Sequence, residues 1–109
     1  MWYVFPQLKG LGMSGMAEYY GIDGLDEAAA YIKDPVLRDR LLEISGALLE
    51  LDSCDAGYVM GYPDDLKLRS CMTLFQAAAP NEIVFQKVLD KFYGGEGDRA
   101  TLKMLGILP

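Results

Sequence analysis

The ten residues SCMTLFQAAA, at positions 70–79, give the clearest indication of how this chain folds. They follow a charged run that begins at Pro63 with Asp64 and Asp65, and Pro80 ends them. Proline and acidic residues are typical of a helix N-terminus, whereas a proline after the run cannot continue a helix. We therefore predict one helix from about 63 to 79. Its second half is nearly all apolar, so we expect it at the centre of the fold.

Further helices are predicted on both sides of this central one. Acidic residues, prolines and glycines in capping positions mark their ends. No stretch alternates with a period of two for long enough to be a secure strand, although Trp2–Phe5 is compatible with extended backbone. The predicted fold is all-α: a compact single-domain bundle of five to six short helices over 1–109, with an irregular N-terminal segment. The predicted helices are a short turn after Ser14, 25–33, 35 to about 51 with Asp34 as N-cap, one turn within 53–61, 82–93 capped by Asn81, and 99–105 capped by Asp98.

The helix that begins at Pro35 has the clearest amphipathic pattern. Its apolar residues recur at spacings of four, three, four and three, which places them on one face of a helix. We predict that this face packs on the core, and a partner helix is the alternative. The residues concerned are Leu37, Leu41, Ile44, Leu48 and Leu51.

The composition excludes several classes of function. The chain has 10 Lys and Arg against 16 Asp and Glu in 109 residues, a net charge of −6. An acidic protein is a poor general binder of nucleic-acid backbones or of anionic membranes, because both need a cationic face. No signal peptide or long apolar span is visible. We therefore expect a cytoplasmic protein with neither a nucleic-acid nor a membrane partner.

The chain contains no histidine, which removes the commonest general base and the commonest metal ligand. Its two cysteines, Cys54 and Cys71, do not make a zinc site by themselves. Without histidine, neither Ser53 nor Cys54 has the base that activates a nucleophile. We predict no metal and no cofactor. Cys71 lies in the apolar helix, where a buried free thiol is favoured over a disulfide.

Three glycines near the N-terminus spell G-x-G-x-x-G at 10–15. A dinucleotide-binding loop needs a strand before this pattern and a long helix after it within a βαβ unit, and neither is predicted here. We expect the glycines to serve a sharp turn. The alternative is that free backbone N–H groups at the start of the Ser14 turn hold an anion.

Polar residues in the central helix leave two alternatives open. One alternative is a solvated helix start, in which Asp65 and Arg69, four residues apart, form an ion pair beside Lys67. The other is that these three residues form an acid–base cluster. Ser70 and Thr73 lie within the apolar half. Such residues must either form hydrogen bonds in the core or line a small pocket.

Several runs of the sequence together resemble the bacterial family known as domain of unknown function 1810. These runs are MWYVFPQLKGLG at 1–12, DPVLRDRLLE at 34–43, PDDLKLRSCMTLF at 63–75 and FQKVLDKFYGGEGDRATLKML at 85–105. The resemblance covers residues 2–105. It implies a mostly helical single-domain fold and no established activity.

The resemblance also implies a difference. Members of the family usually begin with a further amphipathic helix, and this chain starts at Met1 within the segment that follows it. We therefore expect uncovered apolar surface. Losing one amphipathic face costs several kcal/mol, comparable to a domain's net stability. The chain is then either marginally stable as a monomer or forms a homodimer through this surface.

Two functions remain as hypotheses. The first is a binding or interaction module without catalysis, whose site lies where the N-terminal loop meets the central helix. Its cations suit a small anionic ligand. The second is an enzyme in which Asp65 acts as acid or base and Lys67 as electrostatic stabiliser. The candidate ligand-binding residues are Gln7, Lys9, Ser14, Asp65, Lys67, Arg69, Ser70 and Thr73.

Overall fold

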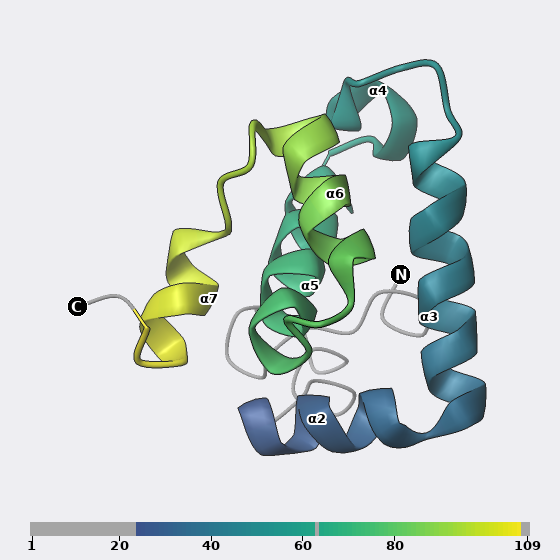
Figure 1. Ribbon diagram of the computed structural model, residues 1–109. Helices are drawn as coiled ribbons and strands as arrows, with labels where there is room; N and C mark the ends of the chain where they lie inside the picture. Colours follow the sequence, from purple (N-terminus) through teal and green to yellow (C-terminus); the bar gives the residue numbers. More distant parts are fainter. Residues whose placement is uncertain (1–23, 63, 108–109) are drawn as a thin grey trace.

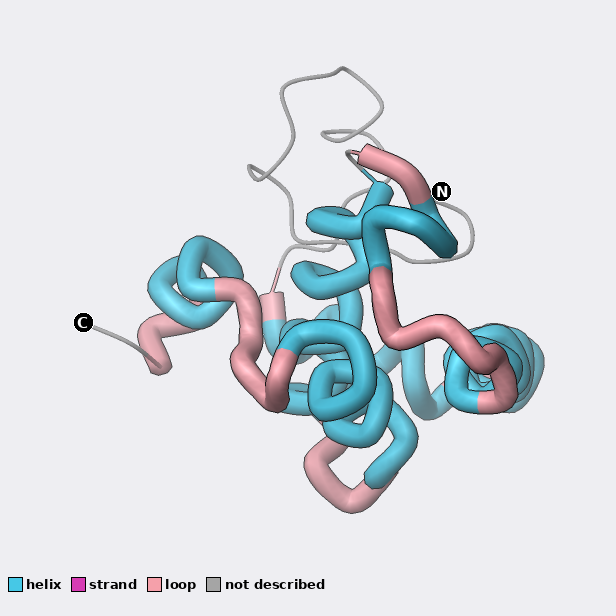
Figure 2. The backbone as a smooth tube through the Cα atoms, turned by 90° about the horizontal axis from the view of Figure 1, so that it is seen from above, coloured by secondary structure: helices cyan, strands magenta, loops and turns pink. Residues whose placement is uncertain are grey.

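The computed structural model describes residues 24–62 and 64–107. Every regular element in these ranges is a helix, as Figures 1 and 2 show, so the predicted all-α class is confirmed. The predictions for Trp2–Phe5, for the turn after Ser14 and for Pro63 lie outside the described residues. The helices are α2 (Leu25–Lys33), α3 (Pro35–Leu49), α4 (Ala56–Met60), α5 (Asp64–Ala78), α6 (Ile83–Tyr93) and α7 (Arg99–Met104).

Side-chain caps fix where several helices begin. Asp34 accepts hydrogen bonds from the first turn of α3, and Asp98 accepts one from the N–H of Thr101 in α7 at 2.9 Å. Both caps were predicted. The cap predicted at Asn81 is wrong, because α6 begins after Glu82 without a side-chain cap bond. The Glu82 N–H bonds to the Ala79 carbonyl at 3.0 Å, so Asn81 lies inside a tight turn before the helix.

Helix α5 is the centre of the molecule, as predicted. It packs against α2, α4, α6 and α7, and it occupies the middle of the view in Figure 1. The rings of Tyr31 and Phe85 lie 5.3 and 5.8 Å from the ring of Phe75, which joins α2 and α6 through α5. The buried residues of α5 are Leu68, Ser70, Cys71, Met72, Thr73, Leu74 and Phe75.

The predicted core face of α3 is only partly correct. Leu41 and Leu48 are buried, but the third buried position is Ser45 and not Ile44, which is 38% exposed. Leu51 is 44% exposed and lies beyond the end of the helix. Helix α3 stands at the edge of the molecule in Figure 1, and its main packing partners among the described helices are α2 and α6. The buried residues of α3 are Leu41, Ser45 and Leu48, so the rest of the predicted face lies outside the core.

Candidate functional site

A cleft of about 680 Å³ lies between the loop before α4, helix α5 and the end of α6. Its lining combines acidic, basic, aromatic and thiol groups. Three segments far apart in sequence meet here because α5 packs against both α4 and α6. The lining residues are Ser53, Cys54, Asp55, Ala56, Gly57, Asp65, Leu66, Arg69, Phe92 and Tyr93.

Arg69 is the cation of this cleft, and two neighbours fix its guanidinium. Its Nε donates to the carbonyl oxygen of Glu96 at 3.1 Å, and its Nη2 lies 3.7 Å from Glu96 Oε2. Its Cζ lies 5.5 Å from the ring centroid of Tyr93, a cation–π distance. The predicted Asp65–Arg69 pair is therefore replaced by a contact to the loop after α6. Gly94, with a φ of 63°, ends α6 in the left-handed conformation and turns the chain toward that contact.

Tyr93 forms the aromatic wall of the cleft. Its hydroxyl donates to the backbone carbonyl of Asp65 at 2.5 Å, which ties the end of α6 to the start of α5. Burial raises the pKa of Tyr93, and the Asp65 carboxylate raises it further, while Arg69 acts in the opposite direction. The phenol is therefore neutral and stays a hydrogen-bond donor. The ring of Phe92 lies 6.4 Å away and extends the aromatic surface.

Two carboxylates approach the cleft around Gly57. A Cβ atom at this glycine would lie 3.3 Å from Asp55 Oδ1 and 3.9 Å from Asp65 Oδ2, so both oxygens lie close to one point. Asp55 Oδ1 also accepts from the Tyr58 N–H at 3.2 Å as the cap of α4. The Cys54 thiol is free and exposed beside them. This side of the cleft therefore offers hydrogen-bond acceptors and a negative potential.

Among the predicted site residues that lie in the described part of the chain, Asp65 and Arg69 line this cleft together. Lys67 does not line the cleft. Residues two apart in an α-helix are rotated by about 200°, which places Lys67 across α5 from both of them. Its Nζ lies 3.9 Å from Asp64 Oδ1, one turn away on the helix.

Ser70 and Thr73 form core hydrogen bonds, the first of the two predicted alternatives. The Ser70 hydroxyl donates to the Leu66 carbonyl at 3.2 Å. The Thr73 hydroxyl donates to the Arg69 carbonyl at 2.7 Å and accepts from the Asp98 N–H at 2.8 Å. Both residues are buried and are absent from the lining of the cleft. The remaining site predictions, Gln7, Lys9 and Ser14, lie outside the described residues.

Sequence reasoning missed most of the cleft. Tyr93 meets Asp65 across 28 positions, and Arg69 meets Glu96 across 27, so no local spacing reports either contact. Among the cleft residues that the sequence prediction missed, Asp55 has a recognisable local pattern, because its position before a short helical turn is typical of an N-cap. The capping role alone accounts for an aspartate at this position, so the pattern does not indicate a binding site.

Residues 24–62 and 64–107 contain no group of three or more cysteine, aspartate or glutamate side chains placed to hold a metal ion. None of the helices described is long and apolar enough to cross a membrane.

The fold and the cleft together define a small all-α protein with an open, mixed-charge cavity. The chain belongs to the family described as "Protein of unknown function (DUF1810)", which matches residues 1–105 and confirms the predicted resemblance. It is also similar to the crystal structure of the conserved hypothetical protein Rv1873 from Mycobacterium tuberculosis. The TM-score is 0.94, with 45% sequence identity over 96% of this chain and 75% of the other. No match was found among curated proteins.

Proposed function

We propose that this protein is a binding module without catalysis of its own, and that the cleft between α4, α5 and α6 takes a small ligand with one anionic group. The observation that carries this proposal is the position of Arg69. Its guanidinium is held by the Glu96 carbonyl and by the Tyr93 ring before a ligand arrives. A positioned side chain loses little freedom on binding, and guanidinium forms charge-assisted hydrogen bonds to phosphate or carboxylate.

The other groups of the cleft restrict which class of small molecule fits. Asp55 and Asp65 repel a second negative charge and accept hydrogen bonds from hydroxyl or amino groups. Tyr93 and Phe92 offer an aromatic surface to an apolar part of the ligand. The best match is a small molecule with one phosphate or carboxylate group and several hydroxyl or amino donors.

The net charge bears on the partners and the location of the protein. A net charge of −6 repels polyanions, which supports a protein with no nucleic-acid or membrane partner. We place it in the cytoplasm as a single domain over 1–109. The alternative of an enzyme that uses Asp65 and Lys67 gains no support, because these two residues lie on different sides of α5 and do not line one cavity.

The test is a thermal-shift screen of hydroxylated monophosphates and monocarboxylates, with inorganic phosphate as the reference anion. Compounds that raise Tm are then titrated by calorimetry. We expect Arg69→Gln to weaken binding at least about tenfold, because a hydrogen bond to a charged group contributes about 1.5–3 kcal/mol. Lys67→Gln, a cation of the same helix outside the cleft, is the matched control and keeps wild-type affinity.

One further variant and one further measurement make the outcome decisive. Arg69→Lys keeps the charge but loses the planar fork, so it binds with intermediate affinity. Circular dichroism establishes that each variant is folded before it is titrated. The proposal fails if no compound raises Tm, or if Arg69→Gln binds as tightly as the wild type.

A further inference from the structure

Two carboxylates of the cleft between α4, α5 and α6 belong to no ion pair within the described part of the chain. Asp55 Oδ1 accepts from the Tyr58 N–H, and Asp65 Oδ1 accepts from the Leu66 N–H at 3.0 Å. An ionised carboxylate has about four acceptor positions in all. Each of the two side chains therefore keeps acceptor positions for a ligand, and both line the cleft.

Gly57 keeps the space beside these two carboxylates open. A Cβ atom at this position would lie 3.3 Å from Asp55 Oδ1 and 3.9 Å from Asp65 Oδ2, and Gly57 itself lines the cleft. Its φ is not among the positive values, so the backbone does not require glycine here. Glycine inside a helix is also less favourable than alanine. What the missing side chain provides is room for a ligand atom near both oxygens.

Arg69 supplies the opposite charge in the same cleft. It follows Asp65 by one turn of α5, and its Nε donates to the Glu96 carbonyl at 3.1 Å. A guanidinium group binds a carboxylate through parallel hydrogen bonds, while an ammonium group has donors that suit paired carboxylates. We propose that the ligand of this cleft is a small amino acid, whose carboxylate binds Arg69 and whose ammonium group binds beside Gly57, within reach of both carboxylates. This inference rests on the proposed function, since it uses the same cleft and the same anion-binding arginine.

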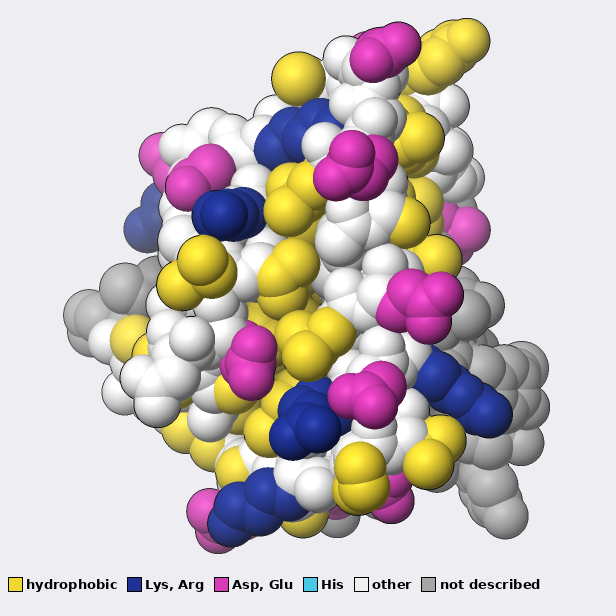
Figure 3. Space-filling model, turned by 45° about the vertical axis from the view of Figure 1, so that its right-hand side comes forward, with side chains coloured by type: hydrophobic (Ala, Val, Ile, Leu, Met, Phe, Trp, Pro, Cys, Tyr) yellow, Lys and Arg dark blue, Asp and Glu magenta, His cyan; other side chains and the backbone are white. Residues whose placement is uncertain are grey.

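A ligand without net charge also suits the electrostatics of the whole molecule. The chain carries a net charge of −6, which repels small anions at long range but exerts little net force on a zwitterion. On the face seen in Figure 3, acidic and basic side chains lie interspersed among hydrophobic ones, without a broad positive region that would attract an anion. The aromatic surface of Phe92 and Tyr93 is left for the side chain of the amino acid.

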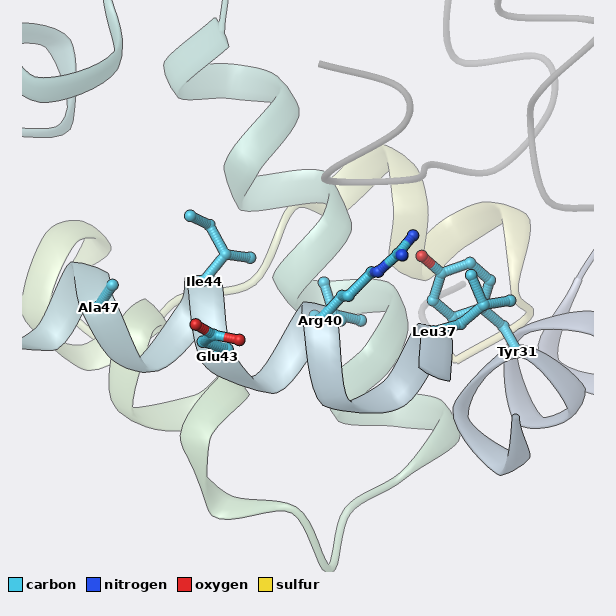
Figure 4. Close-up of a pocket in the computed structure, with 7 residues that line it drawn as sticks. Tyr31, Leu37, Arg40, Glu43, Ile44 and Ala47 are labelled. Atoms are coloured by element: carbon cyan, nitrogen blue, oxygen red, sulfur yellow. The ribbon is translucent and has the colours of Figure 1, made fainter. Parts of the chain in front are cut away.

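A second cavity, of about 420 Å³ along α3, gives a comparison within the same molecule. Figure 4 shows its Arg40 extending toward Tyr31 of α2, with Glu43 apart from both. The other described lining residues are Leu37, Leu41, Ile44 and Ala47. Because a single carboxylate lies among its described lining residues, this cavity lacks the pair of acceptors found beside Gly57. Arg40 therefore serves as the control arginine in the test.

Matched pairs of ligands test the ammonium site separately from the anion site. Phenylalanine and hydrocinnamate share a carbon skeleton and differ by the amino group, as do γ-aminobutyrate and butyrate. We expect the amino member of at least one pair to bind the wild type at least about tenfold more tightly in calorimetry, because hydrogen bonds between charged groups are the strong ones. Arg69→Gln weakens the binding of both members of that pair, whereas Arg40→Gln changes neither.

Variants of the carboxylate side test the position of the ammonium group. Asp65→Asn keeps the shape and removes the charge, so the preference for the amino member falls at least about fivefold. Gly57→Ala fills the open space and lowers the same preference without straining the backbone. Asp64→Asn is the matched control, because Asp64 lies next to Asp65 but pairs with Lys67 and does not line the cleft. It keeps the preference, and circular dichroism establishes that each variant is folded.

The outcomes separate this inference from the proposed function. The amino-acid ligand is overturned if neither amino compound binds more tightly than its amine-free partner. It is also overturned if the preference survives in both Asp65→Asn and Gly57→Ala, or if Asp64→Asn removes it as fully as Asp65→Asn. Amine-free carboxylates that bind through Arg69 would still support the proposed anion-binding function. If no monoanion binds at all, including those of the thermal-shift screen, both proposals fail.

Discussion

The ammonium group of Lys91 on α6 lies 2.8 Å from the carbonyl oxygen of Leu48 in the last turn of α3. The same group donates to the Leu49 carbonyl at 3.1 Å and to the Leu51 carbonyl. The last carbonyls of a helix have no partner within the helix, and they carry the negative end of its dipole. One lysine from a neighbouring helix therefore caps the C-terminal end of α3 and links it to α6.

Replacement of this lysine should destabilise the protein. Lys91→Met keeps the aliphatic stem and removes the charge, so the carbonyls of Leu48, Leu49 and Leu51 lose the ammonium donor that they share. We expect the free energy of unfolding to fall by about 1–3 kcal/mol, measured by urea denaturation. Lys87→Met, on the exposed side of the same helix, should change it by less than about 0.5 kcal/mol. Equal effects of the two substitutions would contradict this role.

A substitution at a buried hydroxyl in α3 should stabilise the protein, in contrast to the replacement of Lys91. Ser45 is fully buried, and its Oγ has no hydrogen-bond partner among the residues that the structure describes. An unpaired buried polar group costs about 1–3 kcal/mol. Ser45→Ala removes that group with almost no change of volume and should raise the urea midpoint. Gly46→Ala, the neighbouring position with open space for a methyl group, controls for the gain in helix propensity alone.

Thr73 joins the central helix to the segment before α7. Its hydroxyl accepts from the Asp98 N–H at 2.8 Å, and a Cβ atom at Gly97 would approach its side chain to 3.1 Å. Thr73→Val keeps the shape but leaves the Asp98 N–H unpaired, so we expect a loss of about 1–3 kcal/mol. Thr73→Ser keeps the hydroxyl and should lose less. If the serine variant is the weaker one, packing of the methyl group outweighs the hydrogen bond.

The sequence predicted those parts of the fold that local physics decides. Asp34 and Asp98 cap helices because their side chains reach N–H groups two or three residues away, a distance that spacing alone reveals. The burial of Phe75 was predictable because it lies in the nearly all-apolar second half of α5. The orientation of α3 did not follow, because Ile44 and Ser45 are neighbours and only the positions of α2 and α6 decide which of them faces inward.

The cleft was less predictable for the same reason. Asp65 and Arg69 were candidates because they are polar residues four apart on one helix. Their actual partners, Tyr93 and Glu96, come from a segment 27 or 28 residues later. A single sequence carries no record of such a contact, since it depends on how α5 and α6 cross.

Groups that are buried in neutral form also make stability depend on pH. Burial raises the pKa of the Cys71 thiol well above its ordinary value of 9.0. Burial, with a contribution from Asp65, likewise raises the pKa of the Tyr93 phenol above its ordinary value of 10.0. In the unfolded chain both groups lose their protons at those ordinary values, whereas the folded protein retains them. The folded state then binds more protons than the unfolded state, so the free energy of unfolding falls as pH rises.

We therefore expect these two groups to leave stability unchanged just below about pH 8.5 and to lower it above that pH, because the full contribution of a raised pKa is present only below the unfolded value. Cys71 alone gives a slope of up to about 1.4 kcal/mol per pH unit. Urea denaturation between about pH 8 and 10.5 measures this slope. Cys71→Ala should reduce it, even if the variant is less stable at every pH, while Cys54→Ala, which removes an exposed thiol, should leave it unchanged. An identical slope in the two variants would show that the thiol in the core does not control the alkaline transition.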